Sequence, residues 1–190
     1  MSVFPKPYAD RVARLRVTLG FVMVIAFAWL SNPNELSLTL GLPISVLGLA
    51  LRAWATGHLE KNQRLTESGP YAHVRNPLYL GTALVAAGLA TASRSWPLAA
   101  LFTAVFVLIY LPVIELEEQH LSTLFPEFRA YAQRVPQLIP TWGKARSTAQ
   151  FRASLYIKNR EYQALLGFAV GAAVLIAKLT IPGIHEFLNP

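Results

Sequence analysis

Residues 76–114 read NPLYLGTALVAAGLATASRSWPLAALFTAVFVLIYLPVI, and Arg94 is the only charged residue among them. The stretches on either side of Arg94, 76–93 and 95–114, are 18 and 20 residues long. An α-helix needs ~20 apolar residues to cross the hydrocarbon core of a bilayer. Pro97 falls early in the second stretch, where a helix tolerates proline because its first N–H groups have no intrahelical acceptor. The sequence therefore predicts two membrane helices joined as a tight antiparallel hairpin.

Three further stretches without a charged residue, 17–34, 36–51 and 162–177, complete the predicted membrane part of the chain. The last two hold only 16 residues each. We expect Arg52 and Lys178 to extend them by snorkelling, with the aliphatic stem in the lipid and the charge at the interface. The composition agrees, because 54% of the residues are hydrophobic and only 14% are charged, whereas soluble domains are ~25% charged.

We therefore predict an all-α fold, in which one domain, 1–190, is an integral membrane helical bundle. Its five transmembrane helices are expected at approximately 17–34, 36–54, 77–93, 96–114 and 162–181. Close packing of helices is favoured by small residues, notably Gly81 and Gly88 in the third span and Gly167-x-x-x-Gly171 in the fifth.

The net charge of +7 would suggest a nucleic-acid partner in a soluble protein. Here the position of the charges decides otherwise, because 15 of the 17 Lys and Arg lie in the N-terminal segment, in 52–75 and in 115–161. These are alternate connections of a five-span bundle, and positive residues favour the cytoplasmic side. We predict a cytoplasmic N-terminus, a C-terminus on the opposite side, and a location in the bacterial inner membrane without nucleic-acid binding.

Several chemistries are excluded by what the sequence lacks. The chain has no cysteine, so disulfides, thiolate metal ligands and a cysteine nucleophile are impossible. The four histidines show no His-x-x-x-His spacing, and we predict no metal site. No phosphate-binding loop, Gly-x-Ser-x-Gly motif or dinucleotide-binding glycine motif is present.

The first chemically informative segment leads into the third span and contains GPYAHVRNPLYLG, residues 69–81. Asn76-Pro77 marks a helix start, so Arg75 and Asn76 are expected at a helix N-terminus, where N–H groups and the helix dipole favour an anion. The alternative is that Arg75 only anchors the cytoplasmic side, with Tyr71 and Tyr79 as interfacial aromatic residues.

The second segment, 115–136, follows the fourth span and carries an apolar stripe at helical spacing that Pro126 divides into two pieces. Glu117 and Glu118 lie on or beside this stripe at the bilayer boundary. An ionisable residue there is energetically costly and indicates a functional site. The alternative is a hydrated acidic collar that ends the span and pairs with Arg75.

Together, Gly69-Pro70-Tyr71-x-x-x-Arg75-Asn76-Pro77-x-Tyr79-x-Gly81 and the later Glu117-Glu118-x-x-Leu121-x-x-x-Phe125-x-x-Phe128-x-x-Tyr131 resemble the isoprenylcysteine carboxyl methyltransferase family. Membrane phospholipid methyltransferases share its general plan. The resemblance implies an S-adenosylmethionine-dependent methyltransferase with a cytosol-facing site, built from segments 58–81 and 115–140, that methylates a lipophilic acceptor from the bilayer. The acceptor would be an isoprenylcysteine-like carboxylate or a lipid amine.

By the same resemblance, the cofactor would be held by Gln63, Arg64, Leu65, Tyr71, Asn76, Pro77, Tyr79 and Glu117, with Arg75 and Glu118 in support. Two positions depart from the family pattern. Asn76 replaces the usual histidine, which excludes a titrating base there. Val113 replaces an arginine that the eukaryotic enzymes match to the substrate carboxylate.

Two other functions stay open on the sequence alone. Sterol reductases resemble this family in their C-terminal halves and bind a nicotinamide cofactor, although they are longer. A membrane scaffold or small transporter would use the Gly167-x-x-x-Gly171 face for oligomer contacts and the glutamates for a cation or proton. The basic segment 141–161 could cover the active site, bind anionic lipid head groups or orient the fifth span, and we expect the orienting role.

Overall fold

The computed structural model describes residues 6–141 and 149–181, apart from the side chains of residues 6, 9–10, 12–19 and 21. Every regular element in these ranges is helical, as predicted. In chain order they are α1 (Lys6–Leu30), α2 (Glu35–Thr56), the 3-10 helix η1 (Gly69–Ala72), α3 (Pro77–Ser93), α4 (Trp96–Val105), the π-helix η2 (Phe106–Tyr110), α5 (Leu111–Leu124), α6 (Phe128–Arg134), α7 (Ala153–Lys158) and α8 (Tyr162–Thr180).

Among the described residues, three helices are long and apolar enough to cross a membrane: Glu35–Thr56, Trp96–Leu124 and Tyr162–Thr180. The chain is therefore an integral membrane protein. The second of these is α4, η2 and α5 in one run of 29 residues, so Glu117 and Glu118 lie on a helix that continues past the predicted end at 114. Pro77–Ser93 is also apolar but shorter, and the total of five spans stays a prediction.

Local sequence explains where these helices begin and end. Asn34 caps α2 through a reciprocal pair of hydrogen bonds with Ser37, 2.7 Å and 3.0 Å long. Pro77 occupies the first turn of α3. Pro126 lies between α5 and α6, so the predicted division of the amphipathic segment is confirmed.

Helices α2 and α3 pack with their backbones close together, because glycines face each other at two levels. A Cβ atom added to Gly48 would lie 2.6 Å from Gly81 O, and one added to Gly88 would lie 2.5 Å from Gly41 O. Between these levels, Ser45 Oγ donates to Val85 O at 3.0 Å. The predicted close approach at Gly81 and Gly88 is confirmed, with α2 as the partner.

The snorkelling predicted for Arg52 and Lys178 is wrong. Lys178 is only 4% exposed, and its Nζ donates to Ala28 O and Ser31 O at 2.9 Å and 2.6 Å, at the end of α1. The carbonyl groups at a helix C-terminus attract a cation, so the ammonium turns into the bundle. Arg52 also turns inward, toward Glu161.

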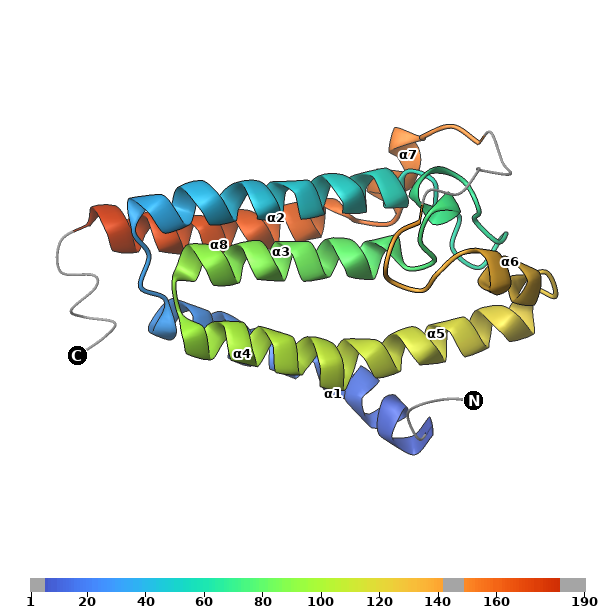
Figure 1. Ribbon diagram of the computed structural model, residues 1–190, viewed down its shortest axis with the longest axis horizontal. Coiled ribbons are helices and arrows are strands. Elements are labelled where there is room, and N and C mark those ends of the chain that lie inside the picture. The colour runs from blue at the N-terminus through green and yellow to red at the C-terminus, as the bar shows by residue number, and fades with distance from the viewer. Residues whose placement is uncertain (1–5, 142–148, 182–190) are drawn as a thin grey trace.

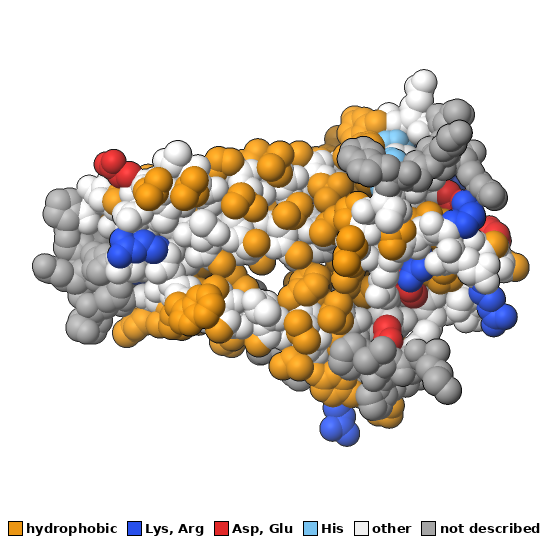
Figure 2. All heavy atoms as spheres, in the orientation of Figure 1, with side chains coloured by type: hydrophobic (Ala, Val, Ile, Leu, Met, Phe, Trp, Pro, Cys, Tyr) orange, Lys and Arg blue, Asp and Glu red, His pale blue; other side chains and the backbone are white. Residues whose placement is uncertain are grey.

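Figure 1 shows α3 between α2 and α4. The helices of the bundle lie along one long axis, some running in one direction and some in the other. The segments η1, α6 and α7 gather at one end of this bundle, and the α3–α4 connection lies at the other. Figure 2 shows hydrophobic side chains over the middle of the bundle and charged side chains mostly toward its ends. This end with η1, α6 and α7, called here the loop end, holds both chemically informative segments.

Candidate active site

The centre of the loop end is an ion pair between Arg75, just before α3, and Glu118 on α5. Arg75 Nε and Nη2 donate to the two carboxylate oxygens of Glu118 at 2.9 Å and 3.0 Å. Both side chains are mostly buried, with 14% and 16% exposed. Asn76 Nδ2 also donates to Glu118 Oε1, at 2.7 Å. The predicted pairing of Arg75 with an acidic residue is therefore confirmed for Glu118, and Arg75 is not left to bind an external anion. The hydrated collar that was to end the span is not confirmed, because the pair is mostly buried and the helix continues to Leu124.

The same arginine ties α6 to the start of α3. Arg75 Nη1 donates to Ala132 O and Val135 O at 2.6 Å and 3.0 Å, which are carbonyls at the C-terminal end of α6. The backbone adds Arg75 N–H to Pro136 O at 2.8 Å. Because a cation at a helix C-terminus satisfies carbonyls that the helix leaves unpaired, Arg75 fixes the position of α6 as well as that of Glu118.

The second carboxylate, Glu117, meets a line of aromatic rings. Tyr79 Oη donates to Glu117 Oε2 at 2.9 Å, while no hydrogen bond from a described residue reaches Oε1. The Tyr79 ring packs edge-on against Tyr110, with centroids 6.0 Å apart. Tyr110 in turn stacks on Phe106 at 5.9 Å. One carboxylate oxygen therefore remains at the edge of an aromatic wall.

Tyr71 forms the buried side of this region and is 7% exposed. Its carbonyl accepts a 2.8 Å hydrogen bond from Tyr131 Oη. Burial raises the pKa of the Tyr71 phenol above its ordinary value, and the nearby negative charge of Glu117 raises that pKa further. Tyr71 therefore stays neutral and presents an uncharged aromatic surface next to Glu117.

The structure brings together most, but not all, of the residues that the resemblance nominated. Seven of them lie around the Arg75–Glu118 ion pair and the Tyr79–Glu117 hydrogen bond: Tyr71, Arg75, Asn76, Pro77, Tyr79, Glu117 and Glu118. Gln63 and Arg64 are exposed, and Arg64 pairs with Glu60 at 3.1 Å. Leu65 packs against the cluster of Phe128 and Tyr131, and with Arg64 it borders a separate depression of about 360 Å³. The described part of the chain contains no group of three or more His, Asp or Glu that could hold a metal ion.

Sequence reasoning missed a second ion pair beside the site. Arg52 Nε and Nη2 donate to Glu161 at 2.6 Å and 3.1 Å, although 109 residues separate them. Arg52 Nη1 also donates to Leu78 O and to Thr82 Oγ1 in the first turns of α3. The sequence does mark Glu161, which is the only acidic residue of the basic segment 141–161. Its partner, however, could not be predicted from the spacing of residues.

The described part of the basic segment, 149–161, folds onto the connection after α2. Arg152 N–H donates to Gly57 O at 2.9 Å, and Asn159 Nδ2 donates to Leu59 O at 3.0 Å. The Phe151 ring packs edge-on against His58. The segment therefore leads directly to Glu161 and α8. Lys144 and Arg146 of this segment lie outside the described residues.

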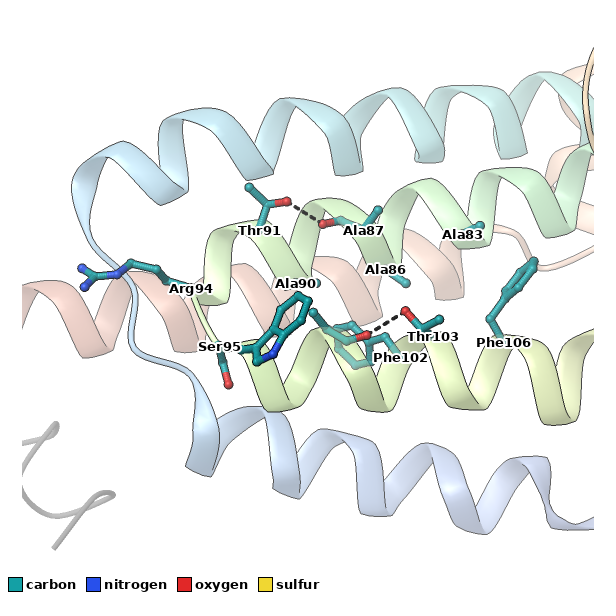
Figure 3. Close-up of a pocket in the computed structure, with 12 residues that line it drawn as sticks. Ala83, Ala86, Ala87, Ala90, Thr91, Arg94, Ser95, Phe102, Thr103 and Phe106 are labelled. Atoms are coloured by element: carbon teal, nitrogen blue, oxygen red, sulfur yellow. Dashed lines mark hydrogen bonds between the residues drawn. The ribbon is translucent and has the colours of Figure 1, made fainter.

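An open groove of about 640 Å³ runs between α3 and α4, away from the loop end. Small alanines on α3, among them Ala83, Ala86 and Ala90, face Phe102 and Phe106 across it (Figure 3). The hydroxyls of Thr91 and Thr103 are engaged by Ala87 O and Ala99 O at 2.9 Å and 2.8 Å. Since Phe106 also stacks on Tyr110, the groove adjoins the aromatic wall of the site.

Comparison with known proteins gives a family match and two relatives. Residues 15–127, more than half of the chain, match the phospholipid methyltransferase family. The cobalt-zinc-cadmium resistance protein CzcN of Cupriavidus metallidurans is 34% identical over 140 residues, covering 68% of this chain and 63% of CzcN. The nickel-cobalt-cadmium resistance protein NccN of Alcaligenes xylosoxydans is 30% identical over 148 residues, or 74% of this chain and 70% of NccN. No solved structure matches.

Proposed function

Because this chain belongs to the phospholipid methyltransferase family, we propose that it transfers a methyl group from S-adenosylmethionine to a lipophilic acceptor in the membrane. The observation that carries the proposal is the pairing of Glu117 with Tyr79 beside the Arg75–Glu118 ion pair. It joins the two sequence segments that the family resemblance assigns to the cofactor. The site would face the cytosol, in keeping with the predicted positive-inside orientation.

The residues present suit the cofactor's chemical groups. An amino acid ammonium needs an acceptor, and Glu117 Oε1 is available next to the oxygen that holds Tyr79. The adenine and the sulfonium need apolar or aromatic surfaces, which Tyr71 and Tyr79 offer. We therefore propose that Glu117, Tyr71, Tyr79, Asn76 and Pro77 hold the cofactor, with Arg75 and Glu118 fixing their positions. The cofactor would be contacted by Gln63, Arg64 and Leu65 only if the connection 61–68 closed over the site.

The cofactor supplies an electrophilic methyl group, so the protein's task is to orient the acceptor and exclude water. Asn76 cannot act as a base, and it donates to Glu118 instead. Glu118 is itself neutralised by Arg75. The side chains of this site therefore favour catalysis by alignment over catalysis by a strong base.

The acceptor is proposed to be a lipid amine rather than a carboxylate. The two arginines beside the site, Arg52 and Arg75, are each paired with a glutamate, and Val113 offers no charge where related enzymes have arginine. Neither of these two arginines is thus left to pair with a substrate carboxylate. The groove between α3 and α4 would receive hydrocarbon, since its lining is mainly alanine and phenylalanine.

Calorimetry in detergent tests the cofactor assignment. We expect S-adenosylmethionine and S-adenosylhomocysteine to bind with micromolar affinity and the Glu117→Gln variant to bind at least tenfold more weakly, about 1.4 kcal/mol. Glu35→Gln is the matched control, because Glu35 is an exposed glutamate at the opposite end of α2. Absence of binding by the folded, unmodified protein would reject the proposal and favour a nicotinamide reductase or a scaffold.

Transfer of a radiolabelled methyl group then tests the acceptor. Vesicles containing phosphatidylethanolamine and micelles of a prenylated cysteine offer an amine and a carboxylate in parallel. Labelling of the amine lipid alone would support the proposed acceptor class. Labelling of the carboxylate alone would reject it while leaving the methyltransferase assignment intact.

A further inference from the structure

The long helix Trp96–Leu124 is interrupted by one π-helical turn at Phe106–Tyr110. The N–H of Leu111 donates to Phe106 O, five residues earlier. Pro112 follows at once and has no N–H, so it cannot donate to Leu108 O as the residue at that position would in a regular α-helix. A carbonyl without a partner is energetically costly inside a membrane span.

A distant side chain takes up this carbonyl. Tyr8 Oη donates to Leu108 O at 2.7 Å, although the two residues are 100 positions apart. Figure 1 shows the start of α1 emerging beside the junction of α4 and α5. Tyr8 therefore replaces the hydrogen bond that Pro112 removes, and it ties α1 to the π-helical turn.

The π-helical turn carries Tyr110, which connects two parts of the molecule. On one side Tyr110 stacks on Phe106, which lines the groove. On the other side it meets Tyr79, whose hydroxyl holds Glu117. A wider turn also sets the rotation of the helix beyond it, because each residue of a helix with 3.6 residues per turn advances by about 100°. The turn thus fixes how Tyr110 and Glu117 face α3.

We propose that Tyr8 is a positioning residue, which holds the π-helical turn so that Tyr110 stays against Tyr79 at the junction of groove and site. Tyr110 is then a further residue of the site, in contact with the methyl acceptor. The catalytic part of this inference rests on the proposed methyltransferase function. The structural part, the effect of Tyr8 on Tyr110, stands independently of it.

The experiment uses four forms of the full chain: unmodified, Tyr8→Phe, Pro112→Ala and the double variant. All are labelled with 3-fluorotyrosine and studied by ¹⁹F NMR, which is practical because the chain has seven tyrosines. Tyr8→Phe is expected to shift or broaden the Tyr110 resonance, assigned by Tyr110→Phe. In the Pro112→Ala background the same substitution should leave that resonance unchanged, since the introduced alanine restores the N–H that Leu108 O needs. An equal shift in both backgrounds, or no shift in either, overturns the proposal.

Kinetics supply the second measurement. We expect Tyr8→Phe to lower kcat for methyl transfer five- to tenfold, while the Kd of S-adenosylmethionine changes less than twofold. In the Pro112→Ala background, the same substitution should change kcat less than twofold. Tyr162→Phe, which removes an exposed hydroxyl on α8, is the control. Unchanged kcat with a shifted Tyr110 resonance would reject the positioning role. No transfer by the unmodified protein would reject the proposed function, while the NMR result would still decide the effect on Tyr110.

Discussion

Arg75 satisfies four acceptors with one guanidinium: both oxygens of Glu118 and the carbonyls of Ala132 and Val135. A buried ion pair of this kind adds little to stability by itself, because removing both charges from water is costly. Loss of one partner is far worse, since it leaves an unpaired charge. The value of Arg75 is therefore in fixing the geometry, because α3, α5 and α6 all meet at this one side chain.

Two buried tyrosines make stability sensitive to alkaline pH. The pKa values of Tyr71 and Tyr131 are raised above the ordinary 10.0, chiefly by burial. Above pH 10 the unfolded chain releases these protons and the folded chain keeps them, so stability falls as pH rises, by about 1.4 kcal/mol per pH unit for each tyrosine. Below pH 9 neither tyrosine should contribute to any pH dependence.

Tyr131→Phe should therefore reduce the slope of unfolding free energy against pH between pH 10 and 11.5. The variant also loses the hydrogen bond to Tyr71 O, so slopes must be compared rather than absolute stabilities. Denaturation in mixed micelles gives both quantities. An unchanged slope in Tyr131→Phe would contradict the assignment.

The close packing of α2 against α3 depends on glycines, which have no side chain. A Cβ atom at Gly88 would lie 2.5 Å from both Gly41 O and Ser45 N. Neither backbone atom can move without separating the helices. Gly167 lies on an apolar helix as well, but a Cβ atom there would meet nothing within 4 Å. The two glycines thus have similar neighbours in the sequence, but Gly88 is tightly packed against another helix and Gly167 is not.

Alanine at these two positions should therefore act in opposite directions. Gly88→Ala should destabilise the protein by about 1–3 kcal/mol through overpacking. Gly167→Ala should stabilise it by up to about 1 kcal/mol, because alanine has the higher helix propensity. Unfolding in mixed micelles measures both changes. Equal effects of the two substitutions would mean that α2 and α3 are not in backbone contact.

One end of the molecule carries the site, and the other end carries the α3–α4 connection (Figure 1). Asn32 N–H donates to Ser93 O at 2.8 Å, so the α1–α2 connection lies at the second end too. If all five predicted helices cross the membrane, Pro7 and Gln63 are cytoplasmic, whereas Asn32 and Arg94 are on the opposite side.

Single cysteines test this arrangement without a background signal, because the natural chain has none. Pro7→Cys and Gln63→Cys should react with a membrane-impermeant maleimide only in inverted vesicles. Asn32→Cys and Arg94→Cys should react only in right-side-out vesicles. Reaction of Pro7→Cys and Asn32→Cys from the same side would show that α1 does not cross the membrane.

Most of the helices and the chemically important segments could be predicted from the amino-acid sequence, because both depend on local order. Charge-free stretches and Asn76-Pro77 define the limits of α2, α3 and α8 to within two residues, and Pro126 separates α5 from α6. The first span was predicted wrongly, because α1 covers Lys6–Leu30 rather than 17–34 and includes charged residues before the apolar stretch. The motifs around Arg75 and Glu117 carry the family resemblance, with which the match to the phospholipid methyltransferase family agrees.

The contacts between side chains from distant parts of the chain could not be predicted from the sequence. Arg52 pairs with Glu161 across 109 residues, and Tyr8 reaches Leu108 across 100. Such contacts follow from how helices are placed, and periodicity within one helix does not encode that placement. Lys178 shows the same limit, since the sequence places it at a membrane boundary but only the nearby end of α1 offers carbonyls that turn it inward.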